Sequence, residues 1–216
     1  MPPAPEGKAP PPGKEAAMKA VKLPKARTES DVSLESTFLT RRSVRSYKNE
    51  PITLEELGQL LWAAQGITHP DGLRTAPSAG ALYPLELYVA AGRVEGLTQG
   101  VYSYDPHKHT LRPVAEGDMR AALSAAALGQ DPVRRGAAVL VFSGVHRRTT
   151  IKYGRRGVRY VHIEVGHAAQ NVCLQAEALG LGALTVGAFD DAKVHGLLKM
   201  GDGEEPLYLM PVGKPF

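Results

Sequence analysis

Apolar positions recur with helical spacing in two long segments of the chain. In the first segment one face is apolar, at positions Leu54, Leu57, Leu61 and Ala64. Thr53 and Glu56 form a capping-box pattern before this face, and Gly66 follows its last turn. These signals predict a helix that begins after Thr53 and ends at Gly66.

The second segment, residues 158–180, keeps helical spacing over more than five turns. Its apolar positions are Val165, Ala168, Ala169, Val172, Ala176 and Leu179. Gly180 follows the last of them, as is typical of a helix C-terminus. We therefore expect one long helix here.

Short apolar runs between these helices predict strands. They lie at 85–92, 136–144 and 206–213, with a short strand and turn at 183–189. Residues 100–114 form a hairpin pattern around the turn sequence DPHKH. Residues 117–129 and 190–200 have helical patterns. Helices and strands are mixed without regular βαβ alternation, which indicates an α+β fold.

The N-terminal segment has a different composition from the rest of the 216 residues. It holds seven of the 17 prolines and almost no large apolar residues. We therefore interpret residues 1–30 as a mobile tail or extended arm, and residues 31–216 as the folded domain.

The net charge of +4 belongs mostly to this tail. Residues 1–30 carry six basic and three acidic residues, which leaves 20 basic and 19 acidic residues in the domain. A nearly neutral domain does not indicate a nucleic-acid partner. The chain has one cysteine, Cys173, and no apolar run of about 20 residues. We expect a cytoplasmic protein with no membrane partner.

Three familiar site patterns are excluded by spacing. His162 and His167 are five residues apart, about 140° around a helix, whereas a zinc-binding helix needs a pair four apart. The sequence GLGALT lacks the third glycine of a dinucleotide fingerprint, and APSAGA does not fit a nucleophile elbow. We expect no metal site.

Four other stretches remain as candidates for binding or chemistry. Residues 41–47, RRSVRSY, would place Arg41, Ser43 and Arg45 on one side of an extended segment, which suits a phosphate. Residues 74–84, RTAPSAGALYP, are small enough for main-chain groups to approach a flat ligand closely. A solvated basic stretch and a tight loop are the simpler alternatives for these two.

The other two candidates follow later in the chain. Residues 185–191, TVGAFDD, form a second small-residue turn, with Asp190 as a helix N-cap. Residues 147–160 hold six basic residues and no acid, so they form either a solvated loop and helix start or a cationic mouth. In the second case Lys152 and Tyr153 could exchange protons with a substrate.

Taken in order, these stretches resemble the nitroreductase family of FMN-dependent enzymes, and specifically its SagB-type dehydrogenase branch. The resemblance covers roughly residues 33–215. It implies a mixed, mainly antiparallel sheet flanked by helices, in an intertwined homodimer with two FMN sites at the interface.

The resemblance also implies roles for individual residues. Arg41, Arg42, Ser43 and Arg45 match the segment that binds the phosphate, ribityl and ring oxygens of FMN. Lys214 falls near the position where the family often has a phosphate-binding cation. The ring-lining segments match Pro77, Ser78, Ala79 and Gly80, and the turn Val186, Gly187 and Ala188. Lys152 and Tyr153 match a catalytic Lys-Tyr pair of the azoline oxidases. Ala81 and Tyr83 stand where many nitroreductases carry Asn and Gln.

Three functions follow from the resemblance. The first is ping-pong hydride transfer from NADH or NADPH, through flavin N5, to a nitro, quinone or similar small acceptor. The second is a SagB-type dehydrogenase that oxidises an azoline-like or peptide substrate with oxygen as acceptor. The third is a flavin-binding module without turnover that serves in a complex.

Overall fold

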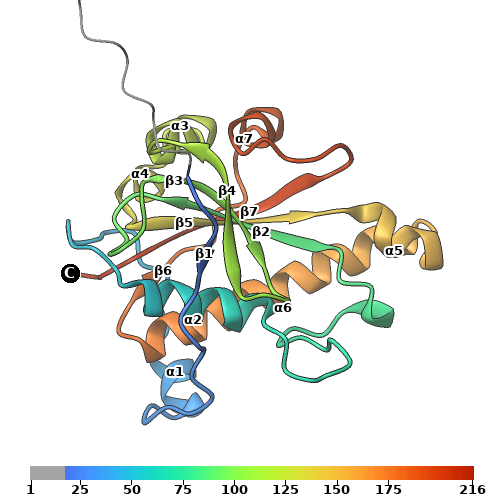
Figure 1. Cartoon of the computed structure of the whole chain (residues 1–216), viewed down its shortest axis with the longest axis horizontal. Helices are drawn as coiled ribbons and strands as arrows, with labels where there is room; N and C mark the ends of the chain where they lie inside the picture. The colour runs from blue at the N-terminus through green and yellow to red at the C-terminus, as the bar shows by residue number, and fades with distance from the viewer. Residues whose placement is uncertain (1–17) are drawn as a thin grey trace, which may run out of the picture.

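A single sheet of seven strands forms the centre of the protein (Figure 1). The structure is a computed structural model and describes residues 18–216. The strand order is β1-β4-β3-β2-β5-β7-β6, and every strand pair in it is antiparallel. The strands are β1 (Val21–Lys22), β2 (Leu85–Ala91), β3 (Gly100–Asp105), β4 (Thr110–Glu116), β5 (Ala138–Gly144), β6 (Gly182–Ala183) and β7 (Glu205–Gly213). Parallel bridges at Ser43–Ala183 and Ile52–Val94 make the sheet mixed, as predicted.

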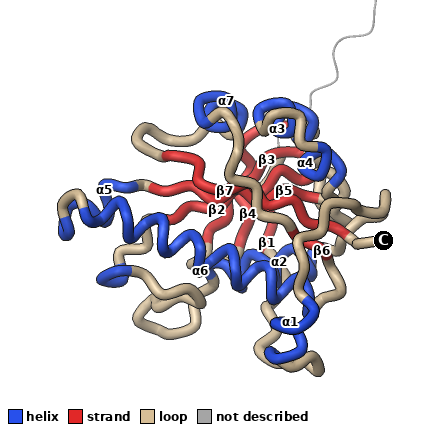
Figure 2. Tube along the Cα trace, turned by 180° about the vertical axis from the view of Figure 1, so that it is seen from behind, coloured by secondary structure: helices blue, strands red, loops and turns tan. Residues whose placement is uncertain are grey.

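Helices cover both faces of the sheet (Figures 1 and 2). One face carries α2 (Leu54–Gln65) and α6 (Arg156–Ala178), with α1 (Leu34–Thr40) against α6. The other face carries α3 (Arg120–Ala126), α4 (Asp131–Arg135) and α7 (Asp191–Leu197). A short helix, α5 (His146–Tyr153), follows β5 and leads into α6. The predicted α+β class is therefore confirmed.

The strand period of two divides the apolar side chains between two cores. In β5, Leu140 and Phe142 belong to the core beneath α2 and α6, whereas Val139 and Val141 belong to the core beneath α3 and α7. All four are fully buried. Successive side chains point to opposite faces of a strand, so a sheet covered on both sides needs a continuous apolar run.

The two long helices form where the apolar spacing predicts them. At the start of α2 the Thr53 hydroxyl accepts from the Glu56 N–H (3.1 Å), and the Glu56 carboxylate accepts from the Thr53 N–H (2.7 Å). The predicted capping box is present. The last helical residue of α6 is Ala178, and Gly180 then adopts a left-handed φ of 69°.

The short strand and turn predicted at 183–189 correspond to β6 and the turn that follows it. Only Gly182 and Ala183 form β6, and further along only Val186 forms an isolated bridge, to Leu209. Val44 packs directly over Gly182, because a Cβ there would lie 2.6 Å from the Val44 Cγ1. The strand therefore begins at a glycine, because a side chain at this position would collide with Val44 of the 41–47 segment. A local apolar pattern does not reveal this contact, since the two segments are far apart in the sequence.

Part of the predicted tail packs against the domain. Val21 and Lys22 pair with β4, and the Leu23 side chain is 3% exposed within the core. The Arg27 N–H donates to the Gln59 side chain at 2.8 Å. Residues 18–30 are thus an arm along the sheet edge, upstream of the boundary expected at residue 31. One buried leucine and strand pairing hold these residues against the sheet. Residues 1–17 lie outside the described part of the chain.

Within residues 18–216, no helix combines the length and the apolar composition that crossing a bilayer requires.

Candidate functional site

The first candidate stretch, residues 41–47, runs beside β6 after α1 ends. The Val44 N–H donates to the Ala183 carbonyl at 3.0 Å, and Tyr47 bridges Pro215 in the C-terminal segment. Because Val44 faces Gly182, the neighbouring side chains of Ser43 and Arg45 lie on the opposite side of the extended chain. Both residues are exposed.

The guanidinium groups of this stretch have no acidic partners. Arg42 donates to the carbonyls of Leu39 (3.0 Å) and Arg41 (2.9 Å), and Arg45 donates to the Ser43 carbonyl (3.4 Å). Among residues 18–216, no carboxylate oxygen lies within 4.0 Å of the side-chain nitrogens of Arg41, Arg42 or Arg45. Three uncompensated positive charges in five residues favour an anionic ligand.

Lys214 lies next to the same stretch. Its carbonyl accepts from the Lys48 N–H at 2.9 Å, and its ammonium lies 3.9 Å from the Glu50 carboxylate. The structure therefore places Lys214 with the 41–47 segment, although Glu50 compensates part of its charge. We call Arg41, Arg42, Ser43, Arg45 and Lys214 the cationic cluster.

The turn at 186–188 continues from β6 on this side of the sheet. Val186 exchanges two main-chain hydrogen bonds with Leu209, at 2.8 and 3.0 Å, and its side chain is buried. Gly187 and Ala188 are exposed, and the Ala188 carbonyl accepts from Gln130 at 3.0 Å. The exposed part of the turn therefore presents small side chains and a main chain that a flat ligand can approach.

The loop that contains Pro77, Ser78, Ala79 and Gly80 meets α5. A Cβ on Gly80 would lie 2.8 Å from the Tyr153 hydroxyl and 3.0 Å from the Lys152 ammonium. Gly80 has a φ of 66°, which glycine adopts without strain. The structure thus brings two separately predicted sites together: the small-residue loop and the Lys152–Tyr153 pair. We call this the loop–lysine cluster.

The backbone of this loop is unusually constrained. Ala81 and Tyr83 have positive φ values of 53° and 45°, close to Gly80. The Ser78 hydroxyl accepts from the Tyr83 N–H at 2.9 Å and so closes the loop. Left-handed backbone at residues other than glycine costs about 1 kcal/mol or more, and such strain is concentrated at functional sites.

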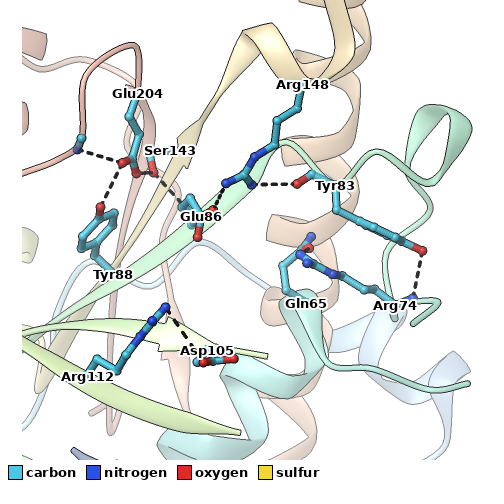
Figure 3. A network of polar contacts seen from close by, with 11 residues as sticks. Gln65, Arg74, Tyr83, Glu86, Tyr88, Asp105, Arg112, Ser143, Arg148 and Glu204 are labelled. Atoms are coloured by element: carbon cyan, nitrogen blue, oxygen red, sulfur yellow. Dashed lines mark hydrogen bonds and ion pairs between the residues drawn. The ribbon is translucent and has the colours of Figure 1, made fainter. Parts of the chain in front are cut away.

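One residue of the basic run at 147–160 has an acidic partner. Arg148 forms an ion pair with Glu86 and donates to the Tyr83 carbonyl at 3.1 Å (Figure 3). Arg148 therefore ties α5 to the end of the small-residue loop. Lys152 remains exposed beside Gly80.

The sequence reading missed Glu164, a buried acid beneath this loop. Glu164 is 2% exposed on α6, and one of its carboxylate oxygens has no hydrogen-bond partner among the described residues. Burial raises the pKa of Glu164 to about 7, against a contact with Ser78 and the positive charge of Arg74, which both lower it. The sequence did contain a signal for this residue. Helical spacing places Glu164 on the same face as Val161, Val165 and Ala168, so an acid lies among buried apolar side chains.

The two clusters lie near opposite ends of α6 (Figures 1 and 2). The α5 helix leads into the N-terminus of α6, and β6 follows its C-terminus. The 23 residues of α6 span about 34 Å. One chain therefore does not bring its cationic cluster and its loop–lysine cluster to the same small ligand.

Comparison with known proteins agrees with this architecture. The sequence model described as the nitroreductase family matches residues 39–214. A Methanocaldococcus jannaschii protein named as a nitroreductase is 47% identical over 184 residues, 85% of this chain and 92% of the relative. A solved structure from Ralstonia eutropha, also named as a nitroreductase, superposes with a TM-score of 0.81 at 28% identity, covering 98% of this chain and 96% of that one.

The chain belongs to the nitroreductase family, and it is an oxidoreductase of that family. The Escherichia coli microcin B17-processing protein McbC is a more distant relative, 30% identical over 66% of this chain and 55% of its own. Family members typically bind flavin. The three unpaired guanidinium groups of the cationic cluster and the exposed small-residue turn at Gly187 suit the phosphate and the flat ring of such a group.

Proposed function

We propose that this protein is an FMN-dependent oxidoreductase that acts as a homodimer with two composite sites. In each site the cationic cluster of one copy binds the phosphate end of FMN, and the loop–lysine cluster of the second copy lines the ring. When bound, FMN would supply hydride transfer between NADH or NADPH and a nitro, quinone or similar small acceptor. The observation that carries the proposal is the separation of the two clusters along α6.

Exposed apolar side chains support the dimer. On α1 these are Leu34 (55% exposed), Phe38 (58%) and Leu39 (75%), and on α5 and α6 they are Ile151 (75%) and Ile163 (48%). Exposed large apolar side chains favour burial against a partner. A two-fold arrangement with antiparallel α6 helices would place each cationic cluster near the other copy's loop–lysine cluster.

The chain's own residues then have distinct tasks. Arg41, Arg42 and Arg45 hold the anionic end through charge-assisted hydrogen bonds, and Ser43 and Lys214 add donors. The main chain at 77–80 and 186–188 allows close approach to the ring. Lys152 and Tyr153, held beside Gly80, exchange the proton that accompanies each hydride with the substrate.

A second candidate rests on the same Lys152–Tyr153 pair. We propose as the alternative a SagB-type dehydrogenase, which would oxidise an azoline-like or peptide substrate with oxygen as acceptor. The pair at Gly80 and the likeness to McbC favour it. Anaerobic addition of NADH or NADPH separates the candidates, since bleaching of the flavin absorbance supports the first and its absence contradicts it.

A complementation experiment tests the composite site directly. Arg41→Ala and Lys152→Ala should each inactivate the homodimer, the first by releasing FMN. Mixing the two variants under conditions of subunit exchange places one intact site in each heterodimer, so about a quarter of the wild-type activity should return. Differently tagged copies that co-purify would confirm exchange. Co-purification without recovery of activity would refute a site built from two copies.

A further inference from the structure

A cavity of about 420 Å³ opens between the C-terminal end of α2, the start of β2 and the β3–β4 turn. It is lined by Gln65, Arg74, Tyr83 and Glu86 and by charged residues of the hairpin (Figure 3). None of the residues assigned above to flavin or to proton exchange lines it. Its size is within the usual range for small-molecule sites.

The charges around this cavity do not balance. Three guanidinium groups line it, from Arg74, Arg112 and Arg148, against the carboxylates of Glu86 and Asp105. Arg148 pairs with Glu86, and Arg112 lies 4.0 Å from Asp105. Arg74 has no carboxylate oxygen within 4.0 Å among the described residues.

Arg74 is nevertheless held in a defined position. One of its terminal nitrogens donates to the Gln65 side-chain oxygen at 2.7 Å, and its guanidinium lies 4.4 Å from the centroid of the Tyr83 ring. Burial and the charge of Arg148 lower the pKa of Arg74, while Glu86, Tyr83 and Glu164 raise it. The cavity therefore has one oriented cation in excess.

Two buried donors at this cavity lack acceptors. Gln65 is 1% exposed, and its amide nitrogen has no hydrogen-bond partner among the described residues. The Nε of Arg74 is also buried without a partner. A buried donor left unpaired costs about 1–3 kcal/mol, so such groups are rare unless a ligand satisfies them.

We propose that this cavity binds a small organic carboxylate. A single negative charge matches the one excess cation, and a carboxylate accepts from Arg74 and from the Gln65 amide at once. A dianionic phosphate would be repelled by Glu86 and Asp105, which line the same space. The Tyr83 ring and Leu87 offer apolar surface to the organic part.

The position of Tyr83 connects this site to the loop–lysine cluster. Its ring stacks on Arg74, its N–H donates to Ser78, and its carbonyl accepts from Arg148. A ligand that binds between Arg74 and Arg148 would therefore also hold Tyr83, and through Tyr83 the loop that contains Ser78. The binding itself does not depend on the proposed flavin chemistry.

The test is calorimetric titration of the full-length protein with acetate, benzoate and phenylacetate, each beside its neutral amide. At least one carboxylate should bind saturably and its amide should not, and inorganic phosphate should fail to compete. Arg74→Met should weaken that binding about 10- to 100-fold. Arg134→Met, on the opposite face of the sheet, is the matched control and should bind as the wild type does.

Removal of Arg74 could also unfold the loop, so two milder variants accompany it. Arg74→Lys keeps the charge but loses the planar donor fork, and Arg112→Met removes a cation whose side chain is 61% exposed. Both should weaken carboxylate binding while the circular dichroism spectrum stays unchanged. Three results would overturn the proposal. The first is saturable carboxylate binding that survives in folded Arg74→Lys and Arg112→Met, the second is equal binding of the amides, and the third is no saturable binding of any carboxylate.

Discussion

Glu164 gives the fold a measurable dependence on pH. Its side chain is 2% exposed between α6 and the small-residue loop, and burial raises its pKa from an ordinary value of 4.5 to about 7. The groups that oppose this rise are the Ser78 hydroxyl and the Arg74 guanidinium. The folded protein therefore binds a proton at Glu164 between about pH 4.5 and 7, where the unfolded chain has released it.

The size and sign of the effect follow from proton linkage. A pKa difference of about 2.5 between the folded and unfolded states corresponds to about 3 kcal/mol. Because the folded state holds the extra proton, the free energy of unfolding falls as the pH rises through this window. Below pH 4.5 Glu164 is protonated in both states and does not lower the free energy of unfolding. Above pH 7 the full destabilisation by the buried carboxylate is present.

Glu164→Gln removes this ionisation while keeping a polar side chain of the same shape. We expect the variant to unfold with a free energy about 1–3 kcal/mol higher than the wild type at pH 8, and close to it at pH 4.5. Urea denaturation at a series of pH values and one protein concentration measures the difference. The exposed Glu95→Gln makes the same chemical change outside the buried site and serves as the control.

The reasoning fails if Glu164→Gln keeps the wild-type dependence of unfolding free energy on pH. It also fails if the variant is less stable than the wild type at pH 8 while Glu95→Gln is unchanged. The first result would mean that the pKa of Glu164 does not differ between the folded and unfolded states. The second would mean that the ionised carboxylate is stabilised in the folded protein, with Arg74 outweighing burial.

Three further predictions concern the arm, the cap and the loop. Leu23→Ala should lower the free energy of unfolding by about 2–4 kcal/mol, because the side chain is 3% exposed, and limited proteolysis should then cut the arm sooner. Thr53→Ala removes the α2 cap and should cost about 1 kcal/mol in urea denaturation, with no change in flavin absorbance. Gly80→Ala should slow flavin reduction by NADH or NADPH about tenfold or more in stopped-flow measurements, because its Cβ would collide with the Tyr153 hydroxyl. Gly96→Ala shares the positive φ but has open space around it, so it should leave that rate unchanged.

The long elements of this fold could be predicted because their signals are local. Leu57 and Leu61 are fully buried in α2, and Val165 and Val172 are buried in α6, as the helical period requires. The β3–β4 hairpin follows from two strand patterns around one turn. Short helices such as α4 could not be predicted, because five residues make too few turns for a helical period to appear. The pairing of Lys22 with β4 could not be predicted either, because it depends on a strand that is distant in the sequence.

The sequence by itself determined which residue types were available: guanidinium groups at 41–45, small residues at 77–80 and 186–188, and an acid on an apolar helix face. Only the tertiary structure decided which of them meet. It placed Gly80 against Lys152, the cationic cluster at the far end of α6, and Glu164 and Arg74 behind the loop. The physical reason is that hydrophobic periodicity depends only on the position of a residue within its own helix or strand. Burial, the local charge and the proton affinity of a side chain depend on neighbours that the sheet brings from elsewhere in the chain.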